Sequence, residues 1–284
     1  MGHHTVPQEY LRGFASPARE EYVWLHARGD SEPRHVPIAK ALQSRGFYRP
    51  ETEVSLARDV EKPANAVLRK LAAGDSITDE ERAHFTYYLA VMHERVPAAR
   101  RKIDELAPEV LDRAIENTRT KLHEVADDSD IASGRLATRL SELDELHVRY
   151  REKIPKVVLE DAYEPWPGEP VLNAIYSMNW HILRTDGPQC FVTCDNPFFY
   201  FAERGIGNAH SEVTFPLTTN ATLNCSWRPS ADRLVFKDVT QRIVKNINRR
   251  LASHADTVVI YHEPAPWILR LLSAGSVALE SFTR

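Results

Sequence analysis

Two short polar segments carry the residue types best suited to acid–base or metal chemistry. One begins with His3-His4 and continues to Pro7, and the other is Asp195-Asn196-Pro197. A histidine can act as a general base or bind a metal ion, and a carboxylate at a strand end can do either. Both segments also have a local explanation. A histidine before a proline turn is often only a hydrogen-bonding group, and Asp-Asn-Pro is common in turns.

Established catalytic signatures are mostly absent. The sequence contains neither the glycine-rich loops that bind nucleotide phosphates nor a Gly-x-Ser-x-Gly nucleophile elbow. The segment from His93 to Pro97 begins like the zinc motif His-Glu-x-x-His but lacks its second histidine. His84 cannot replace it, because nine helical steps of about 100° place His84 on the opposite face from His93. The pattern therefore excludes a zinc peptidase of this type.

The elements that must position these residues differ along the chain. Residues 1–50 predict short elements separated by proline and glycine, with one strand at 21–25 that is rich in aromatic and β-branched residues. Residues 51–155 predict helices. An apolar stripe that starts at Leu56 has helical spacing, and a capping box at 78–81 opens the next helix.

Two long charged segments, 99–126 and 133–154, predict an antiparallel helical hairpin with its turn at 127–130. At 1.5 Å per residue, about 28 residues span roughly 40 Å, which exceeds what the core of one mid-sized domain covers. Apolar side chains then stay partly in water unless the stripes meet each other or a second chain; these are Leu111, Ile115, Leu136 and Leu140. Because two-fold dimers are the commonest oligomers, we expect a homodimer with the hairpin in its interface.

Residues 156–284 predict both helices and strands. Strands are expected at 190–194, 213–226, 232–237 and 256–262. Helices are expected at 170–184, 239–253 and 267–272. The predicted fold class is α+β: predominantly helical, with a small antiparallel or mixed sheet from the C-terminal third plus an N-terminal strand, and a long helical hairpin. We expect a single domain over residues 1–284, with the hairpin at 99–154 as a subregion.

Composition limits the class of protein. The 36 Lys and Arg residues against 40 Asp and Glu give a net charge of −4, which argues against binding nucleic acid by bulk charge. The cysteines, Cys190, Cys194 and Cys225, are too few for a disulfide framework and suit a reducing compartment. The sequence has no apolar run of 18 residues and no signal-like start, so we expect a cytoplasmic protein that does not bind membranes.

A series of motif positions carries a family resemblance. They are His-x-x-Pro-x-x-Tyr-Leu-x-x-Phe at His4 to Phe14, Gly46-Phe47-Tyr48, Glu61, Arg95-x-Pro97, Phe191 to Pro197, and Asn248 ahead of the apolar run Thr257 to Tyr261. In this order they resemble the domain of unknown function 4238 family, which is mainly bacterial, over nearly the whole chain. The resemblance implies a single family-wide domain and a set of positions, not a reaction. Cys194 stands where the family usually has serine, which argues against a role for a hydroxyl there.

The matched polar positions predict one site. Those expected to be catalytic are His4, Glu61, Arg95 and Asp195, and those expected to bind substrate are Tyr10, Asn196 and Asn248. Glu61 borders the apolar stripe of its helix, so it needs a cationic partner such as Arg95. A structural ion pair between two helices explains these two residues equally well. In a catalytic pocket, His4 and Asp195 would hold a divalent metal ion or act in acid–base catalysis, while Arg95 holds an anionic oxygen.

Two classes of function follow from this site. The set suits hydrolysis of a phosphodiester or another anionic substrate better than redox chemistry, for which no cofactor motif exists. We therefore predict a hydrolase, such as a metal-assisted nuclease or phosphodiesterase; the sequence leaves its cofactor unknown, with a divalent metal ion as the candidate. The alternative is a non-catalytic module that binds a small anionic ligand, or a protein partner through the charged hairpin. A catalytic pocket requires His4 and Asp195 to lie together.

Overall fold

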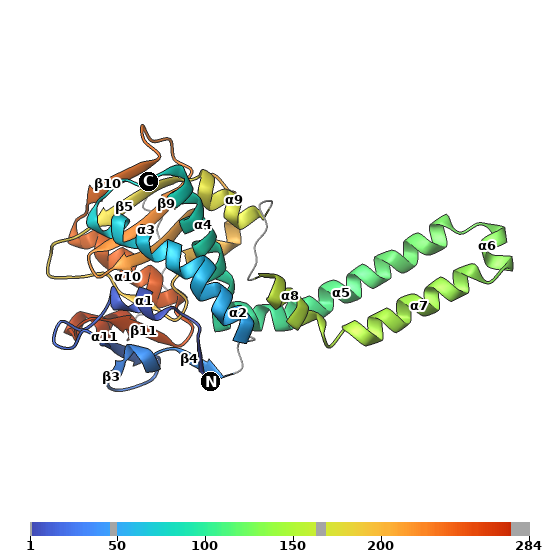
Figure 1. The fold of residues 1–284 in the computed structure, drawn as a ribbon, viewed down its shortest axis with the longest axis horizontal. Helices are drawn as coiled ribbons and strands as arrows, with labels where there is room; N and C mark the ends of the chain where they lie inside the picture. Colours follow the sequence, from blue (N-terminus) through green and yellow to red (C-terminus); the bar gives the residue numbers. More distant parts are fainter. Residues whose placement is uncertain (1, 46–49, 163–168, 274–284) are drawn as a thin grey trace. The chain divides into compact units, whose positions relative to one another are not determined.

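The computed structural model describes residues 2–45, 50–162 and 169–273 (Figure 1). The chain forms two compact units, which we call the main unit (Met1–Pro97 with Pro165–Arg284) and the hairpin unit (Ala98–Glu164). The described strands all belong to the main unit. Helices and small sheets together give the α+β class that the sequence predicts. The motif Gly46-Phe47-Tyr48 lies outside the described residues.

Three small sheets occur in the described part of the main unit. The first pairs β1 (Gly2–His4) with β4 (Gln43–Arg45). The second has the order β10 (Leu234–Asp238), β5 (Asn179–Arg184), β9 (Ala221–Ser226), β8 (Glu212–Thr218), β7 (Phe199–Tyr200). The third has the order β3 (Arg34–Pro37), β2 (Tyr22–Ala27), β11 (Val258–Tyr261), β6 (Thr193–Cys194). β10 runs parallel to β5 and the other pairs are antiparallel, so the predicted N-terminal strand does join strands of the C-terminal third.

Helices surround these sheets. Those described in the main unit are α1 (Gln8–Arg12), α2 (Pro50–Ser55), α3 (Lys62–Ala73), α4 (Asp79–Glu94), α9 (Pro170–Ser177), α10 (Gln241–His254) and α11 (Pro266–Ser273), with 3₁₀ turns η1 (Ile38–Lys40) and η3 (Ala202–Arg204). Between α2 and α3 the chain winds as a π-helix, η2 (Leu56–Glu61). The predicted capping box is confirmed, because Thr78 Oγ1 accepts from the Glu81 amide at 3.1 Å and Glu81 accepts from the Thr78 amide at 2.9 Å.

Three predicted elements were wrong in extent. The helix expected at 170–184 ends at Ser177 and continues as β5, where the Trp180 ring is buried and its Nε1 donates to the Ile175 carbonyl at 2.9 Å. The strand expected at 213–226 is the hairpin β8–β9. Of the strand expected at 190–194, only β6 pairs in a ladder. Sequence periodicity cannot separate these cases, because short apolar runs fit either structure.

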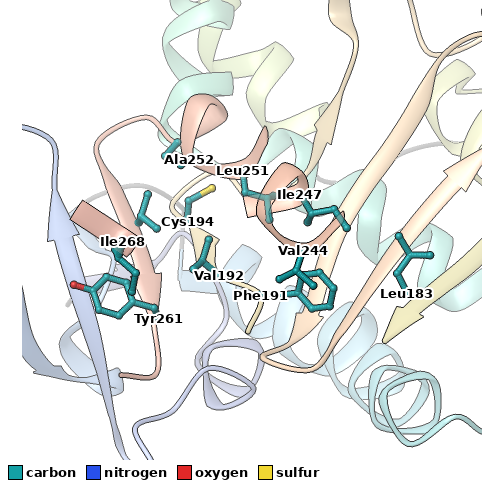
Figure 2. Close-up of a cluster of buried hydrophobic side chains, with 12 residues drawn as sticks. Leu183, Phe191, Val192, Cys194, Val244, Ile247, Leu251, Ala252, Tyr261 and Ile268 are labelled. Atoms are coloured by element: carbon teal, nitrogen blue, oxygen red, sulfur yellow. The ribbon is translucent and has the colours of Figure 1, made fainter. Parts of the chain in front are cut away.

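The core beneath α10 joins the third sheet to the helices (Figure 2). α10 buries Val244, Ile247 and Leu251, which recur at helical spacing on one face. That face packs on the extended segment that precedes β6 and on β11, and α11 adds Ile268. The buried members of the cluster are Leu183, Phe191, Val192, Cys194, Val244, Ile247, Leu251, Ala252, Ala255, Val259, Tyr261 and Ile268. Burial of this apolar surface fixes α10, and with it the residues on its polar face, against the sheet.

The hairpin unit matches the predicted antiparallel hairpin. Its helices are α5 (Pro97–Val125), α6 (Asp128–Ala132), α7 (Arg135–Tyr150) and α8 (Ile154–Ala162), and α5 lies beside α7 with α6 at their junction (Figure 1). The expected turn at 127–130 is instead the start of α6, which Asp127 caps. Asp112 accepts from His147 at 2.7 Å and from Arg151 at 3.0 Å across the two helices. No helix in the described part of the chain is long and apolar enough to cross a membrane.

Candidate functional site

Arg95 contacts two of the other residues that the sequence predicts to be catalytic, Glu61 and His4. Its Nη1 donates to Glu61 Oε1 at 2.6 Å, and its Nη2 donates to the His4 carbonyl at 2.8 Å. The Arg95 side chain is only 3% exposed, so the predicted ion pair is confirmed and is largely buried. Glu61 is the last residue of the π-helix, and π-turns occur frequently at functional sites. The contacts tie β1, η2 and the end of α4 together.

The Tyr88 hydroxyl adds a polar group to this cluster. The side chain is fully buried, and its hydroxyl has no hydrogen-bond partner among the described residues. Burial raises the pKa of Tyr88 well above its usual value; Glu61 raises this pKa further and Arg95 lowers it. We call Glu61, Tyr88, Arg95 and the His4 carbonyl the arginine cluster. It stabilises the end of α4 and leaves one buried hydroxyl unused.

The His4 ring is engaged in a separate set of hydrogen bonds. Its Nδ1 lies 3.2 Å from the Ala41 carbonyl, while its Nε2 lies 3.0 Å from the Gln8 amide nitrogen and 3.3 Å from that of Gln43. These partners place the ring proton on Nδ1, because a carbonyl can only accept it. The Nε2 lone pair therefore accepts from side-chain amides. Gln8 and Gln43 would have to turn away before His4 could bind a metal ion or a substrate proton.

The Asp195 carboxylate caps the start of β11. Its Oδ1 accepts from the Asp256 amide at 2.9 Å. Its Oδ2 accepts from the Thr257 amide at 2.7 Å, from the Thr257 hydroxyl at 2.6 Å and from the Val258 amide at 3.2 Å. Asp195 and His4 share no hydrogen-bond partner among the described residues. The structure thus brings His4, Glu61 and Arg95 into contact and gives Asp195 its own network.

The predicted metal site gains no support from this arrangement. Within residues 2–45, 50–162 and 169–273, no group of three or more His, Cys, Asp or Glu side chains is placed to hold a metal ion. His4 and Asp195 both use their polar atoms in hydrogen bonds to the protein. The metal role of these two residues stays a prediction.

The predicted substrate-binding residues hold the segment that leads into β6. Tyr10 Oη lies 2.7 Å from Thr193 Oγ1. Asn248 accepts from the Val192 amide at 3.1 Å and donates to the Cys190 carbonyl at 2.9 Å. The amide of Asn248 thereby replaces a neighbouring strand, which explains why this segment is extended without a ladder. The third residue, Asn196, donates to the His254 carbonyl at 3.5 Å.

A cluster that sequence reasoning missed lies around His93 and His254. The His93 ring packs on the rings of Phe198 at 5.1 Å and Tyr200 at 5.4 Å, and its Nε2 lies 3.5 Å from Glu94 Oε1. His254 Nε2 donates to the Phe198 carbonyl at 3.1 Å. We call His93, Glu94, Phe198, Tyr200 and His254 the histidine cluster. It gathers two imidazoles, a carboxylate and a phenol around one short segment.

Electrostatics distinguishes the members of the histidine cluster. Burial, and to a lesser extent the neighbouring His93, lower the pKa of His254 to about 4, so this imidazole is neutral at neutral pH. Burial and the nearby Glu94 carboxylate raise the pKa of Tyr200, so its hydroxyl keeps its proton. The His93 side chain is 22% exposed and can meet solvent. An accessible imidazole beside a protonated phenol is a set that can accept one proton and donate another.

The two clusters are joined through the end of α4. His93 and Glu94 close this helix, and Arg95 follows directly as its C-cap. At the end of α10, the His254 carbonyl accepts a hydrogen bond from Asn196. Asn196 lies two residues before Phe198, so this bond anchors the loop that leads into the segment from Phe198 to Tyr200. The available sequence signal was the run His93-Glu94-Arg95 next to a motif arginine. This run lies at the end of α4, whereas its neighbour His254 could only be found from the tertiary structure.

Comparisons with known proteins agree with the resemblance of the sequence. The family model described as "Protein of unknown function (DUF4238)" matches residues 2–265, which is nearly the whole chain. Neither the curated proteins nor the solved structures contain a significant match to the chain. The matched range includes the arginine cluster and the histidine cluster. The chain is therefore a member of the DUF4238 family.

Proposed function

We propose that the protein is a hydrolase whose acid–base site is the histidine cluster. The observation that carries the proposal is the convergence of His93 and His254, from the ends of α4 and α10, on the segment from Phe198 to Tyr200. Perturbed titratable groups gathered from distant parts of a chain are typical of functional sites. The substrate class, a phosphodiester or another anionic ester, is the one that the sequence predicts.

The roles follow from exposure and protonation. His93 is accessible and takes the proton of the attacking water, while Glu94 orients its ring. The water oxygen bonds to phosphorus as the ester P–O bond breaks, and the protonated Tyr200 hydroxyl supplies a proton to the leaving oxygen. The neutral His254 adds no positive charge beside His93, so it does not oppose proton uptake there. Arg95 supports the helix end through Glu61 instead of binding substrate.

The test compares two histidines of the same helix. His84 is exposed on α4, outside the histidine cluster. Hydrolysis of bis(p-nitrophenyl) phosphate and of short single-stranded RNA and DNA is measured with and without added Mn²⁺. We expect His93→Gln to lower the rate about 10²- to 10⁴-fold, as for loss of a general base. His84→Gln should keep the rate. Equal rates for the two variants, or no hydrolysis of any substrate by the wild type, would contradict the proposal.

The hairpin unit supports a second candidate function, the binding of a protein partner. Several of its large apolar side chains are exposed, including Leu106, Val110, Val125, Ile131, Leu146 and Val148. α5 and α7 cover each other on one side only, so Leu111, Ile115, Leu136 and Leu140 remain partly exposed, as expected. We propose a second copy of the chain as the partner, giving a homodimer. Light scattering at tens of micromolar protein should then give twice the monomer mass.

The proposal also includes a cytoplasmic location and an anionic substrate. The three cysteines are free thiols, which suits the reducing cytoplasm. The partner in catalysis would be a small anionic molecule or a nucleic acid segment, held locally and not by bulk charge. The proposed roles do not require a divalent metal ion, and the assay with added Mn²⁺ tests whether one takes part. A rate that depends on Mn²⁺ and on His4 or Asp195 would favour the metal-assisted form of the reaction.

A further inference from the structure

A pocket of about 220 Å³ lies in the main unit between α10 and α11, away from the residues of the histidine cluster. Its lining includes Gln189, Lys245, Asn248, Arg249, Trp267 and Arg270. One lining residue, Asn248, also clamps the segment before β6 through its amide. Because that segment and α10 belong to the buried core, the pocket is built on a rigid base.

The charge of the pocket is one-sided. Lys245, Arg249 and Arg270 line it, and the described lining residues include no Asp or Glu. Lys245 and Arg249 are exposed on successive turns of α10, and neither has an ion-pair partner in the described part of the chain. Like charges four residues apart on a helix repel each other. Two exposed cations without a described carboxylate partner, Lys245 and Arg249, therefore favour an anionic occupant of this hollow.

The uncharged lining residues narrow the class of anion. Gln189 Oε1 is buried and accepts no hydrogen bond from any described residue. A buried acceptor without a donor is unfavourable, so we expect the Gln189 amide to turn toward an occupant of the pocket that offers it a hydroxyl group. Trp267 and Leu271 give the pocket an apolar wall, on which the C–H face of a sugar or a flat ring can pack. The volume is below the range of about 300–1,000 Å³ typical of drug-sized ligands, which suits a smaller molecule.

We propose that this pocket binds a sugar phosphate, either free or as the 5′-phosphate end of a nucleotide. The phosphate lies beside Lys245 and Arg249, a sugar hydroxyl donates to Gln189 Oε1, and the sugar packs on Trp267. This site is separate from the histidine cluster and does not depend on the proposed hydrolysis.

The test is calorimetric titration of the full chain with ribose 5-phosphate, AMP, inorganic phosphate and ribose. Ribose 5-phosphate should bind at least tenfold more tightly than inorganic phosphate, and ribose alone should not bind. Equal binding of AMP and ribose 5-phosphate assigns the ligand to the 5′-phosphate end of nucleotides as well as to free sugars.

Variants locate the binding. Arg249→Ala and Lys245→Ala should each weaken ribose 5-phosphate at least tenfold, whereas Arg242→Ala, an exposed cation of α10 outside the lining, should not. Gln189→Leu should reduce ribose 5-phosphate binding to the level of inorganic phosphate, and His93→Gln should leave it unchanged. Undiminished binding in the Arg249 and Lys245 variants would overturn the proposal. Binding of a single-stranded oligonucleotide, together with no detectable binding of any small phosphate, would also overturn the sugar-phosphate proposal and favour a nucleic-acid-binding surface.

Discussion

Replacement of His254 by asparagine should change how the stability of the protein depends on pH. The buried imidazole donates from Nε2 to the Phe198 carbonyl, and asparagine keeps an N–H donor without a titrating ring. Burial first, and His93 second, lower the pKa of His254 from its ordinary 6.5 to about 4 in the folded protein. Between these two values the unfolded chain binds a proton at His254 that the folded protein does not bind. Stability contributed by His254 is therefore present above the unfolded pKa and is lost as the pH falls.

The magnitude follows from the two pKa values. Between about pH 7.5 and about pH 5, this single group should lower the free energy of unfolding by about 2 kcal/mol. Urea unfolding curves of the wild type and of His254→Asn are recorded at both pH values. Their difference isolates the contribution of His254 to the free energy of unfolding, because the other titratable groups are shared by both proteins. The variant should lose about 2 kcal/mol less than the wild type over this range. His84→Asn, changed at an exposed site, should behave as the wild type does. Parallel pH dependences in wild type and His254→Asn would refute the burial of a neutral imidazole there.

Three further outcomes follow from the contacts. Glu61→Ala removes the carboxylate that accepts from the buried Arg95 guanidinium and should cost about 3 kcal/mol, measured as a fall in the urea midpoint; an unchanged midpoint would mean that the pair contributes nothing. Asn248→Ala removes the clamp on the chain before β6, so hydrogen exchange at the Val192 amide should accelerate markedly while amides of the hairpin unit keep their rates. Replacing residues 105–145 by a short linker should convert the proposed dimer to a monomer in light scattering; a dimer of unchanged stoichiometry would place its interface elsewhere.

Local signals in the sequence predicted the local structure well. The capping box at Thr78 forms because its partner Glu81 lies one turn away, and such contacts need no tertiary information. The ion pair of Glu61 with Arg95 was predictable because a carboxylate at the edge of an apolar stripe needs a cation. The α+β class followed from the change of periodicity along the chain.

Contacts between distant segments could not be predicted in the same way. The pairing of β1 with β4 and the winding of η2 as a π-helix leave no mark in the local periodicity. The substrate-binding role of Asn248 stays a prediction; the sequence does not indicate that its amide also satisfies the backbone of an extended segment 56 residues earlier in the chain. His254 meets the surroundings of His93 only because α10 packs on the sheet. Tertiary packing, and not the spacing of residues, assembles the histidine cluster.

The most direct test of the proposed active site is a crystal structure of the protein soaked with a dinucleoside phosphorothioate. This slowly cleaved phosphodiester has no terminal phosphate, so it does not match the ligand proposed for the pocket between α10 and α11. We expect its phosphorothioate group within hydrogen-bond distance, roughly 3 Å, of the His93 ring nitrogen that does not face Glu94, or of Tyr200 Oη. A phosphorothioate bound elsewhere, with His93 and Tyr200 contacting only protein, would contradict the assignment of the histidine cluster as the site of hydrolysis.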